Sequence, residues 1–204
     1  MSEPRVCVLI TSGGSWESGF GFDLARCMAF TASQGIALNI SLVSGSMLPQ
    51  NRTMLVKDAV ARQATHYMWF DDDMRFPKET ILRLLEHDKE IVCANYRWRN
   101  SPEKWVSYTK EVGYIETTEN SSGLEQVTSI GFGVLMTKPE AFTKIDEPWF
   151  AIGCNQKTNE FLDEGSFACL KWFDAGVPIF IDHDLSKEVK HISQIELGLN
   201  YGAE

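Results

Sequence analysis

The chain has 204 residues, of which 44% are hydrophobic and 23% charged, a composition typical of a globular protein that builds its own core. Its formal net charge of -9 argues against non-specific nucleic-acid binding, which needs a basic surface. The first apolar run, Val6 to Ile10, is too short for a signal segment or a membrane span. The five cysteines form no C-x-x-C pair. We therefore expect a reduced, cytoplasmic protein with no transmembrane segment and no nucleic-acid partner.

The first half of the sequence alternates between strand and helix patterns. Strands are expected over four apolar runs, "RVCVLITS", "IALNISLV", "HYMWF" and "KEIVCANY". Helices are expected in "GFDLARCMAFTASQG", in "NRTMLVKDAVARQA" and after Pro77. The apolar faces of the first two helices are expected to contain Phe22, Cys27, Met28 and Phe30, and Met54, Leu55, Ala59 and Val60. This alternation predicts an α/β fold with a mostly parallel sheet and ligands at the carboxyl ends of its strands.

The second half, after Tyr96, has a different pattern. Residues 104–130 are rich in Thr, Val and Tyr with turn signals between them, which predicts antiparallel hairpins. A strand is expected over "GVLMT", helices over residues 139–144 and "EFLDEGSFACLKWFDAG", and a last strand over "VPIFID". The polar segment "WFAIGCNQKTNEF" is interpreted as a mobile loop. No linker divides the chain, so we expect one domain over residues 1–204.

Three adjacent aspartates, Asp71, Asp72 and Asp73, follow the third expected strand. Their charges repel one another unless a cation or several donors neutralise them. Because side chains alternate along an extended segment, Asp71 and Asp73 would lie on the same side and converge on one hard cation such as Mg²⁺ or Mn²⁺. The alternative is a solvated acidic turn that begins a helix.

The order of these motifs resembles that of the GT-A glycosyltransferases, and most closely the small members related to glycosyltransferase family 2. The resemblance rests on "MLPQNRTMLVKDAV", "HYMWFDDDM", "SIGFGVLMTKPEAF", "DEGSFACLKWFDAGVPIFID" and "KHIS". It implies a Rossmann-like mixed, mostly parallel sheet flanked by helices, with an antiparallel hairpin region in the second half. Residues 1–96 would bind the nucleotide sugar, and residues 97–204 would form the acceptor side. The implied function is a metal-dependent, hexosyltransferase-like transfer from a nucleotide sugar, with a UDP-sugar favoured, to a glycan or other hydroxyl acceptor.

The resemblance also implies roles for individual residues on the donor side. Thr11 and Ser12 would line the pocket for the nucleotide base, and Arg52 would lie near the nucleotide. Gly131 and Gly133 would lie beside the donor sugar. Asp71 and Asp73 would hold Mn²⁺ or Mg²⁺, His191 would supply a further metal ligand, and Asp72 would lie nearer the ribose.

The acid pair Asp163–Glu164 matches the motif that supplies the general base, with the chemical order reversed. Successive helical residues point about 100° apart, so only one of the two can face the cleft. The longer side chain and the second position favour Glu164, and the other acid is expected to face solvent or cap the helix.

Each of these residues also has a plainer interpretation. Arg52 can pair with the aspartates, the acid pair can serve only the helix start, and the two glycines can mark a bulge. His183 competes with His191 as a ligand. Four aromatic residues can stack on an acceptor sugar, although at least half of them are expected to pack in the core or a hairpin, namely Trp98, Trp105, Trp149 and Phe150.

Two other functions compete with glycosyl transfer. A nucleotidyltransferase acting on sugar phosphates also uses an α/β sheet and paired acids. Against it, the glycine-containing stretch "TSGGSWESGFG" has no Lys or Arg. The other alternative is a non-catalytic module that binds a nucleotide sugar.

Overall fold

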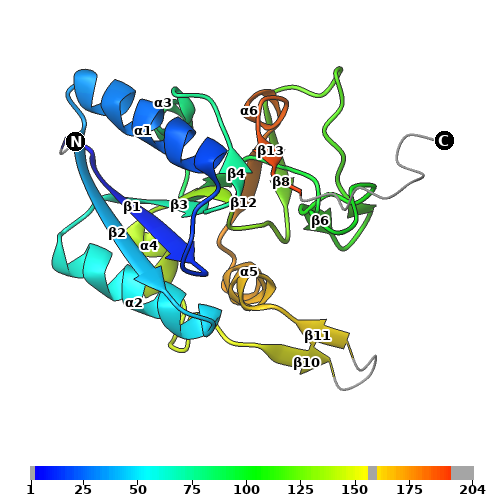
Figure 1. Cartoon of the computed structure of the whole chain (residues 1–204). Coiled ribbons are helices and arrows are strands. Elements are labelled where there is room, and N and C mark those ends of the chain that lie inside the picture. Colours follow the sequence, from blue (N-terminus) through cyan, green and yellow to red (C-terminus); the bar gives the residue numbers. More distant parts are fainter. Residues whose placement is uncertain (1–2, 156–159, 194–204) are drawn as a thin grey trace, which may run out of the picture.

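The centre of the molecule is one twisted sheet (Figure 1). The computed structural model describes residues 3–155 and 160–193. Within them, the main sheet has the strand order β2-β1-β3-β9-β5-β12-β8. The bounds of these strands in chain order are β1 (Arg5–Ser12), β2 (Ala37–Ser44), β3 (His66–Asp71), β5 (Ile91–Cys93), β8 (Leu124–Val127), β9 (Val134–Thr137) and β12 (Ile179–Asp182).

The strand directions confirm the expected mixed, mostly parallel sheet. β1 pairs in parallel with β2 and β3, and β12 pairs in parallel with β5. β9 runs antiparallel to both of its neighbours, β3 and β5, while β8 runs antiparallel to β12. Because two reversals across β9 cancel, β5 points the same way as β3. Only β8 and β9 of the sheet's described strands point the other way.

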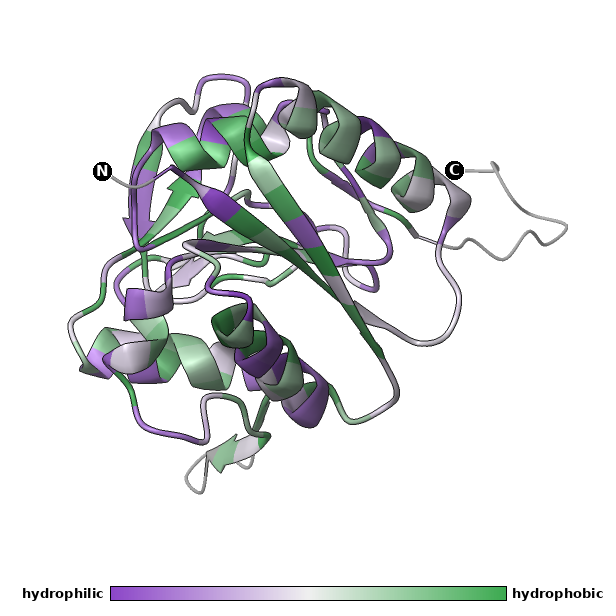
Figure 2. Ribbon diagram, turned by 90° about the vertical axis from the view of Figure 1, so that its left-hand side faces the viewer, coloured by the Kyte–Doolittle hydropathy of each residue, from purple (hydrophilic) through white to green (hydrophobic). Residues whose placement is uncertain are grey.

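Helices cover both faces of this sheet. They are α1 (Ser18–Ser33), α2 (Leu48–Ala61), α3 (Thr80–Glu86), α4 (Pro139–Thr143), α5 (Glu164–Asp174) and α6 (His183–Ser186). Figure 1 shows α1 and α3 on one side of the sheet and α2, α4 and α5 on the other. Side chains alternate along each strand, so Trp69 belongs to one hydrophobic cluster and its neighbours Met68 and Phe70 belong to the other. Figure 2 shows the central strands mostly in the hydrophobic colour, with polar bands on the helices.

The expected apolar faces of α1 and α2 are partly wrong. In α2 the buried residues are Arg52, Leu55, Val56 and Ala59, with Asn51, while Met54 and Val60 are exposed. This stripe has the spacing i, i+3, i+4, i+7 of one helix face. The first residue of this stripe is Arg52, which is charged. A prediction based on hydrophobicity alone therefore assigned the buried face partly to the wrong side of the helix.

In α1, which begins at Ser18, the buried apolar residues are Phe20, Leu24 and Cys27. The expected Phe22 is exposed. Phe22 lies two positions beyond Phe20, and positions two apart in a helix point to opposite sides. The helix therefore buries Phe20 against the sheet and presents Phe22 to solvent.

The hairpin region expected in the second half is present. β6 (Tyr108–Thr109) pairs with β7 (Gly113–Tyr114) as a hairpin. A separate long-range pair joins β4 (Met74–Arg75) of the first half to β13 (Lys190–His191). Residues 149–152 are irregular, as the loop interpretation of residues 149–161 expected, but the rest of the described part is not a loop, because β10 (Gly153–Asn155) pairs with β11 (Glu160–Leu162). Residues 156–159 lie outside the described residues. The expected helix over "EFLDEGSF" begins only at Glu164, since its first three residues belong to β11.

The cysteines match the expectation of free thiols. Cys7 and Cys93 are buried in β1 and β5, and neither they nor Cys27, Cys154 and Cys169 form a disulfide. Among the described residues, no helix combines the length and the apolar character that crossing a membrane requires.

Candidate active site

A cleft of about 660 Å³ opens at the carboxyl ends of β1 and β3. This is the edge of a parallel sheet at which ligands bind in α/β proteins. The cleft brings together segments that are far apart in the sequence: the end of β1, the start of α2, the β3–β4 turn, residues 130–132, the start of α5 and β13. Of the predicted site residues, those that line it are Thr11, Ser12, Arg52, Asp71, Asp72, Asp73, Gly131, Asp163, Glu164 and His191.

Thr11 and Ser12 are the last two residues of β1 and form one wall of the cleft. The parallel register places Thr11 beside Asp71 of β3. The hydroxyl of Ser12 accepts a hydrogen bond from the backbone N–H of Gly14 at 3.1 Å, and the carbonyl of Ser12 accepts one from Gly45. These bonds order the loops at the ends of β1 and β2, which frame this side of the cleft.

Arg52 is the central cation of the cleft and is almost fully buried. Its Nη2 donates to Asp71 Oδ1 at 3.1 Å, and its Nε donates to Glu164 Oε1 at 3.0 Å. Its guanidinium also lies 4.7 Å from the centre of the Phe132 ring, within cation–π range. Burial opposes the charged form of Arg52, but the two carboxylates outweigh this effect and raise its pKa. Arg52 therefore joins the acid at the end of β3 to the acid at the start of α5.

Asp163 and Glu164 have different environments, as expected for adjacent residues at the start of a helix. Asp163 is the N-cap of α5, and its carboxylate accepts from the backbone N–H of Ser166 at 2.7 Å. Glu164 is buried against Arg52 at the wall of the cleft. The acid that caps the helix is thus the first of the pair, and the acid beside the buried cation is the second.

Asp72 and Asp73 form the tight turn between β3 and β4. Asp73 Oδ2 lies 3.1 Å from His191 Nε2 and 2.8 Å from Arg99 Nη1. Burial favours the neutral form of Asp73, but His191 and Arg99 outweigh it and lower the pKa of this carboxyl. The same pairing raises the pKa of His191 against the opposing effect of burial. His191 also contacts the Arg97 carbonyl through Nδ1 at 3.0 Å.

The donor set can be compared with the needs of a divalent ion. No group of three or more His, Cys, Asp or Glu side chains arranged to hold a metal occurs within residues 3–155 and 160–193. Asp73 and His191 are nonetheless adjacent in the cleft and supply one oxygen and one nitrogen ligand. Mg²⁺ is commonly held by one or two carboxylates together with water and substrate phosphates. The residues present fit such a shared ion, and Arg99 would then have to leave Asp73.

Gly131 and Gly133 are both required by the close approach of Tyr96. A Cβ atom at Gly131 would lie 2.2 Å from the Tyr96 hydroxyl oxygen, and one at Gly133 would lie 2.6 Å from it. The N–H of Gly133 donates to that hydroxyl at 2.8 Å, and its carbonyl accepts from the N–H of Asp71. Gly131 lines the cleft, whereas Gly133 lies behind it. Gly133 leaves room for the Tyr96 hydroxyl and, through its carbonyl, fixes the end of β3.

Gly133→Ala is expected to lower the free energy of unfolding by about 1–3 kcal/mol, the usual cost of inserting a methyl group into a packed core. Gly13→Ala is the matched control, because a Cβ at Gly13 meets no atom within 4 Å. Urea unfolding of both variants measures the difference. Adding Tyr96→Phe to Gly133→Ala removes the clashing oxygen and should recover part of the loss. A Gly133→Ala protein as stable as Gly13→Ala would contradict this packing account.

Comparison with known proteins shows similarity to solved structures only. The chain matches no protein-family model and no curated protein. It is similar to A197 from STIV, with 14% identity, a TM-score of 0.56 and coverage of 95% of this chain and 96% of that one. It is also similar to a UDP-glucose pyrophosphorylase complexed with UDP-glucose, with 8% identity, a TM-score of 0.51 and coverage of 93% and 92%. A glycosyltransferase involved in glycosylation of the major capsid of PBCV-1 overlays with 12% identity, a TM-score of 0.44 and coverage of 88% and 93%.

The chain shares its fold with A197 from STIV and with the UDP-glucose pyrophosphorylase. At these identities the overlays establish the fold and leave the activity to be argued from the cleft. The fold that the sequence motifs implied is therefore confirmed.

The sequence did not single out Arg99, Asn100 and Tyr96, which also line the cleft. They belong to the segment that follows β5, so the rule that placed Asp71 at a strand end applies to them as well. The basic and aromatic run "YRWRN" was the available signal. Of the four aromatics that could stack on an acceptor, only Trp98 lines the cleft, while Trp105 and Phe150 are buried and Trp149 packs against the core, so the expectation that at least half of them serve packing is confirmed.

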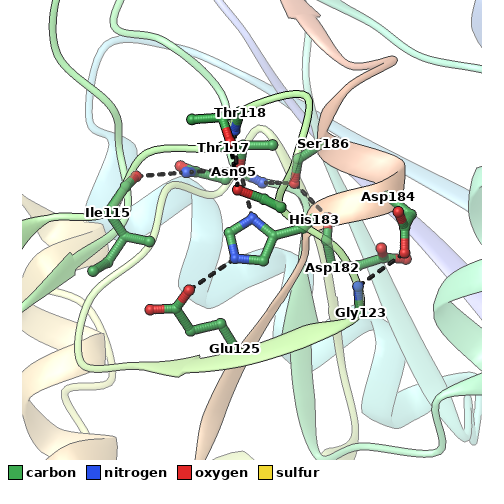
Figure 3. A network of polar contacts seen from close by, with 11 residues as sticks. Asn95, Ile115, Thr117, Thr118, Gly123, Glu125, Asp182, His183, Asp184 and Ser186 are labelled. Atoms are coloured by element: carbon green, nitrogen blue, oxygen red, sulfur yellow. Dashed lines mark hydrogen bonds and ion pairs between the residues drawn. The ribbon is translucent and has the colours of Figure 1, made fainter.

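His183 does not compete with His191 as a ligand in the cleft. It is buried at the start of α6, where Nδ1 lies 2.9 Å from the Thr117 hydroxyl and Nε2 lies 2.8 Å from Glu125 (Figure 3). Figure 3 shows it within a network that also contains Asn95 and Ser186. Both imidazole nitrogens have protein partners, so His183 ties β8 to the segment after β7.

Proposed function

We propose that the protein is a metal-dependent glycosyltransferase that moves a sugar from a nucleotide sugar, with a UDP-sugar favoured, to a hydroxyl acceptor such as a glycan. The observation that carries this proposal is the cleft, in which a buried arginine holds one acid at the end of β3 and a second acid at the start of α5. Metal binding and removal of the acceptor proton require separate acids, and the cleft provides them 91 residues apart in sequence, at Asp73 and Glu164.

The charge of the cleft supports the need for a cation. Five carboxylates line it, against two guanidinium groups and one imidazole: Asp71, Asp72, Asp73, Asp163 and Glu164 against Arg52, Arg99 and His191. A nucleoside diphosphate entering such a site meets repulsion that a divalent ion would offset. We place that ion at Asp73 and His191, whereas Asp71, the further ligand that the resemblance implies, is paired with Arg52. When bound, it would act as a Lewis acid on the developing charge of the departing diphosphate.

The chain's own residues then divide the remaining work. Thr11 and Ser12 bound the side of the cleft that would take the nucleoside. Arg99, released from Asp73, would be free to pair with phosphate oxygens. Glu164 would accept the proton of the acceptor hydroxyl, and Arg52 would hold its carboxylate in place through the bond from Nε. Arg52 therefore positions the base from its buried site in the wall.

The nucleotidyltransferase alternative has a specific point in its favour, since one structure with the same fold is a pyrophosphorylase complexed with UDP-glucose. Against it, the loop after β1 contributes Gly13 to the cleft and no basic side chain. Incubation with labelled nucleotide sugars and Mn²⁺ or Mg²⁺ separates the candidates. Transfer or hydrolysis of the sugar supports our proposal, whereas formation of nucleoside triphosphate and sugar phosphate only when pyrophosphate is added supports the alternative. Binding without turnover indicates a non-catalytic module.

Asp73→Ala is expected to abolish the metal-dependent part of UDP binding while the fold survives, because Asp73 lies in a turn and packs little apolar surface. Calorimetry with UDP, with Mn²⁺ or with a chelator, measures both components. Asp184→Ala is the control, since Asp184 is a carboxylate outside the cleft. Wild-type affinity for UDP that does not change on chelation would remove the metal from the mechanism.

A further inference from the structure

Three aromatic side chains form a row that begins in the cleft and leads out of it. Trp98 lines the cleft, and its ring lies 6.3 Å from that of Tyr114 at an interplanar angle of 78°. The Tyr114 ring lies 5.7 Å from that of Tyr108 at 77°. Trp98, Tyr114 and Tyr108 are called the aromatic track below. The two tyrosines belong to the β6–β7 hairpin, which Figure 1 shows on the side of the molecule away from β2.

The track is open to solvent. Trp98, Tyr108 and Tyr114 are 41%, 38% and 44% exposed. By contrast, Trp105 and Tyr96 in the same part of the chain are buried. Burying a large aromatic ring is favourable, so a contiguous row of exposed rings at the mouth of a cleft indicates a binding surface.

Backbone contacts hold the track in a fixed shape. The N–H of Trp98 donates to the Lys104 carbonyl at 2.9 Å and closes a turn over residues 98–104. Arg97 and Trp105 form an antiparallel β-bridge at the base of this turn. Tyr108 and Tyr114 are direct partners across the β6–β7 hairpin. The N–H of Tyr108 also donates to the Ser129 carbonyl at 3.0 Å. The rings are therefore presented without the ordering cost that a mobile loop would impose.

We propose that the aromatic track binds the acceptor, and that the acceptor is a neutral oligosaccharide long enough to reach beyond the cleft. This inference rests on the proposed function and names its acceptor class. Each ring offers an apolar face to the C–H groups of one sugar unit, while the indole N–H and phenol O–H can bond sugar hydroxyls. Successive rings are nearly perpendicular, which suits a chain whose units turn relative to one another.

Other occupants fit this surface less well. A single-stranded nucleic acid also stacks on aromatic rings, but it needs a strongly basic groove, and this chain has a net charge of -9. A purely apolar protein segment would bury the indole N–H and the two phenol O–H groups of the track without hydrogen-bond partners, which is costly. The track is continuous with the cleft through Trp98, as an acceptor site must be.

The experiment measures the affinity of neutral oligosaccharides of one to six sugar units, presented on an array, for fluorescently labelled protein. The proteins compared are the wild type, Tyr114→Ala and Tyr114→Phe. Trp16→Ala is the matched control, because Trp16 is 40% exposed and lies off the track and outside the cleft. We expect Tyr114→Ala to lose about tenfold or more in affinity for the longer chains, with little change for single sugars. Tyr114→Phe should retain most of the affinity, and Trp16→Ala should behave as the wild type.

The results for the track can be told apart from the results for the proposed function by measuring UDP binding and UDP-sugar turnover on the same proteins. Wild-type protein that retains no oligosaccharide, or a Tyr114→Ala protein that binds as the wild type does, would overturn the track. Loss of self-association in Tyr114→Ala, with sugar binding unchanged, would make the track a contact between copies of this chain. Sugar binding that depends on Tyr114 in a protein that turns over no nucleotide sugar would keep the track and overturn the proposed transferase.

Discussion

Arg52→Ala is expected to lower the free energy of unfolding by about 3 kcal/mol, a cost typical of removing one partner from a buried ion pair. The change leaves Glu164 buried without its cation and removes the charge partner of Asp71. It also removes a guanidinium that packs on Phe132. Urea unfolding followed by circular dichroism measures the loss. Turnover of the nucleotide sugar should fall as well, because the carboxylate of Glu164 is no longer held in place.

Two further variants show whether the loss belongs to this contact. Arg62→Ala removes another arginine near the end of the same helix, one that pairs with Asp58 at the surface, so it should lower the stability far less than Arg52→Ala. Arg52→Lys keeps the charge, but it replaces the planar guanidinium with a single ammonium group. The ammonium can pair well with Asp71 or with Glu164, but not with both at once. Arg52→Lys should lie between wild type and alanine in stability. Equal stability of Arg52→Ala and Arg62→Ala would show that Arg52 is not a structural cation.

Glu164→Gln is expected to reduce turnover by about a hundredfold or more while UDP binding stays nearly intact. The amide has the shape of the acid and can still accept from Arg52 Nε, but it cannot take a proton from an acceptor hydroxyl. Steady-state kinetics with the donor found in the nucleotide-sugar panel, together with calorimetry for UDP, separate the two effects. A loss of UDP affinity as large as the loss of turnover would assign Glu164 to donor binding.

Asp163→Asn is the matched comparison, since the two acids are adjacent and only their surroundings differ. Asn is also a good N-cap, so the variant should keep the bond to the Ser166 N–H and most of the stability of α5. Its turnover should exceed that of Glu164→Gln. If Asp163→Asn were the inactive variant, the base would be the capping residue. If neither change slowed transfer, a retaining route without a protein base would become the better account.

Much of the fold follows from patterns that are local in the sequence. The strand and helix alternation of the first half is correct because apolar runs, Gly35 and the acidic turn mark its boundaries. The prediction of which helix faces are buried was less accurate, because the buried stripe of α2 starts with the charged Arg52. β11 was taken for the start of α5, since three residues hold too little periodicity to tell strand from helix. Its strand pairing depends on β10, which a local pattern does not show.

The candidate site also has one part that local sequence patterns predict and another part that depends on long-range contacts. The rule that ligands bind at the carboxyl ends of strands placed Thr11, Ser12 and the aspartates correctly in one cleft. Arg52 beside the aspartates and His191 at the metal of Asp73 were among the expectations, but the contacts Arg52–Glu164 and Arg99–Asp73 were not, because local patterns do not show long-range contacts. Arg52 meets Glu164 across 112 residues of sequence, and Asp73 meets His191 across 118. Arg99 reaches Asp73 only because the turn after Tyr96 folds back over the cleft.

The position of β9 between β3 and β5 constrains how the chain can assemble as it is synthesised. β3 and β5 are complete by Cys93, yet the strand that pairs with both does not begin until Val134. A nascent chain that has emerged only through β5 therefore presents one unpaired edge of β3 and both edges of β5, the kind of surface that pairs with other chains and that chaperones protect. A fragment ending after Tyr96 would keep those edges open permanently, so we expect it to aggregate when it is expressed alone.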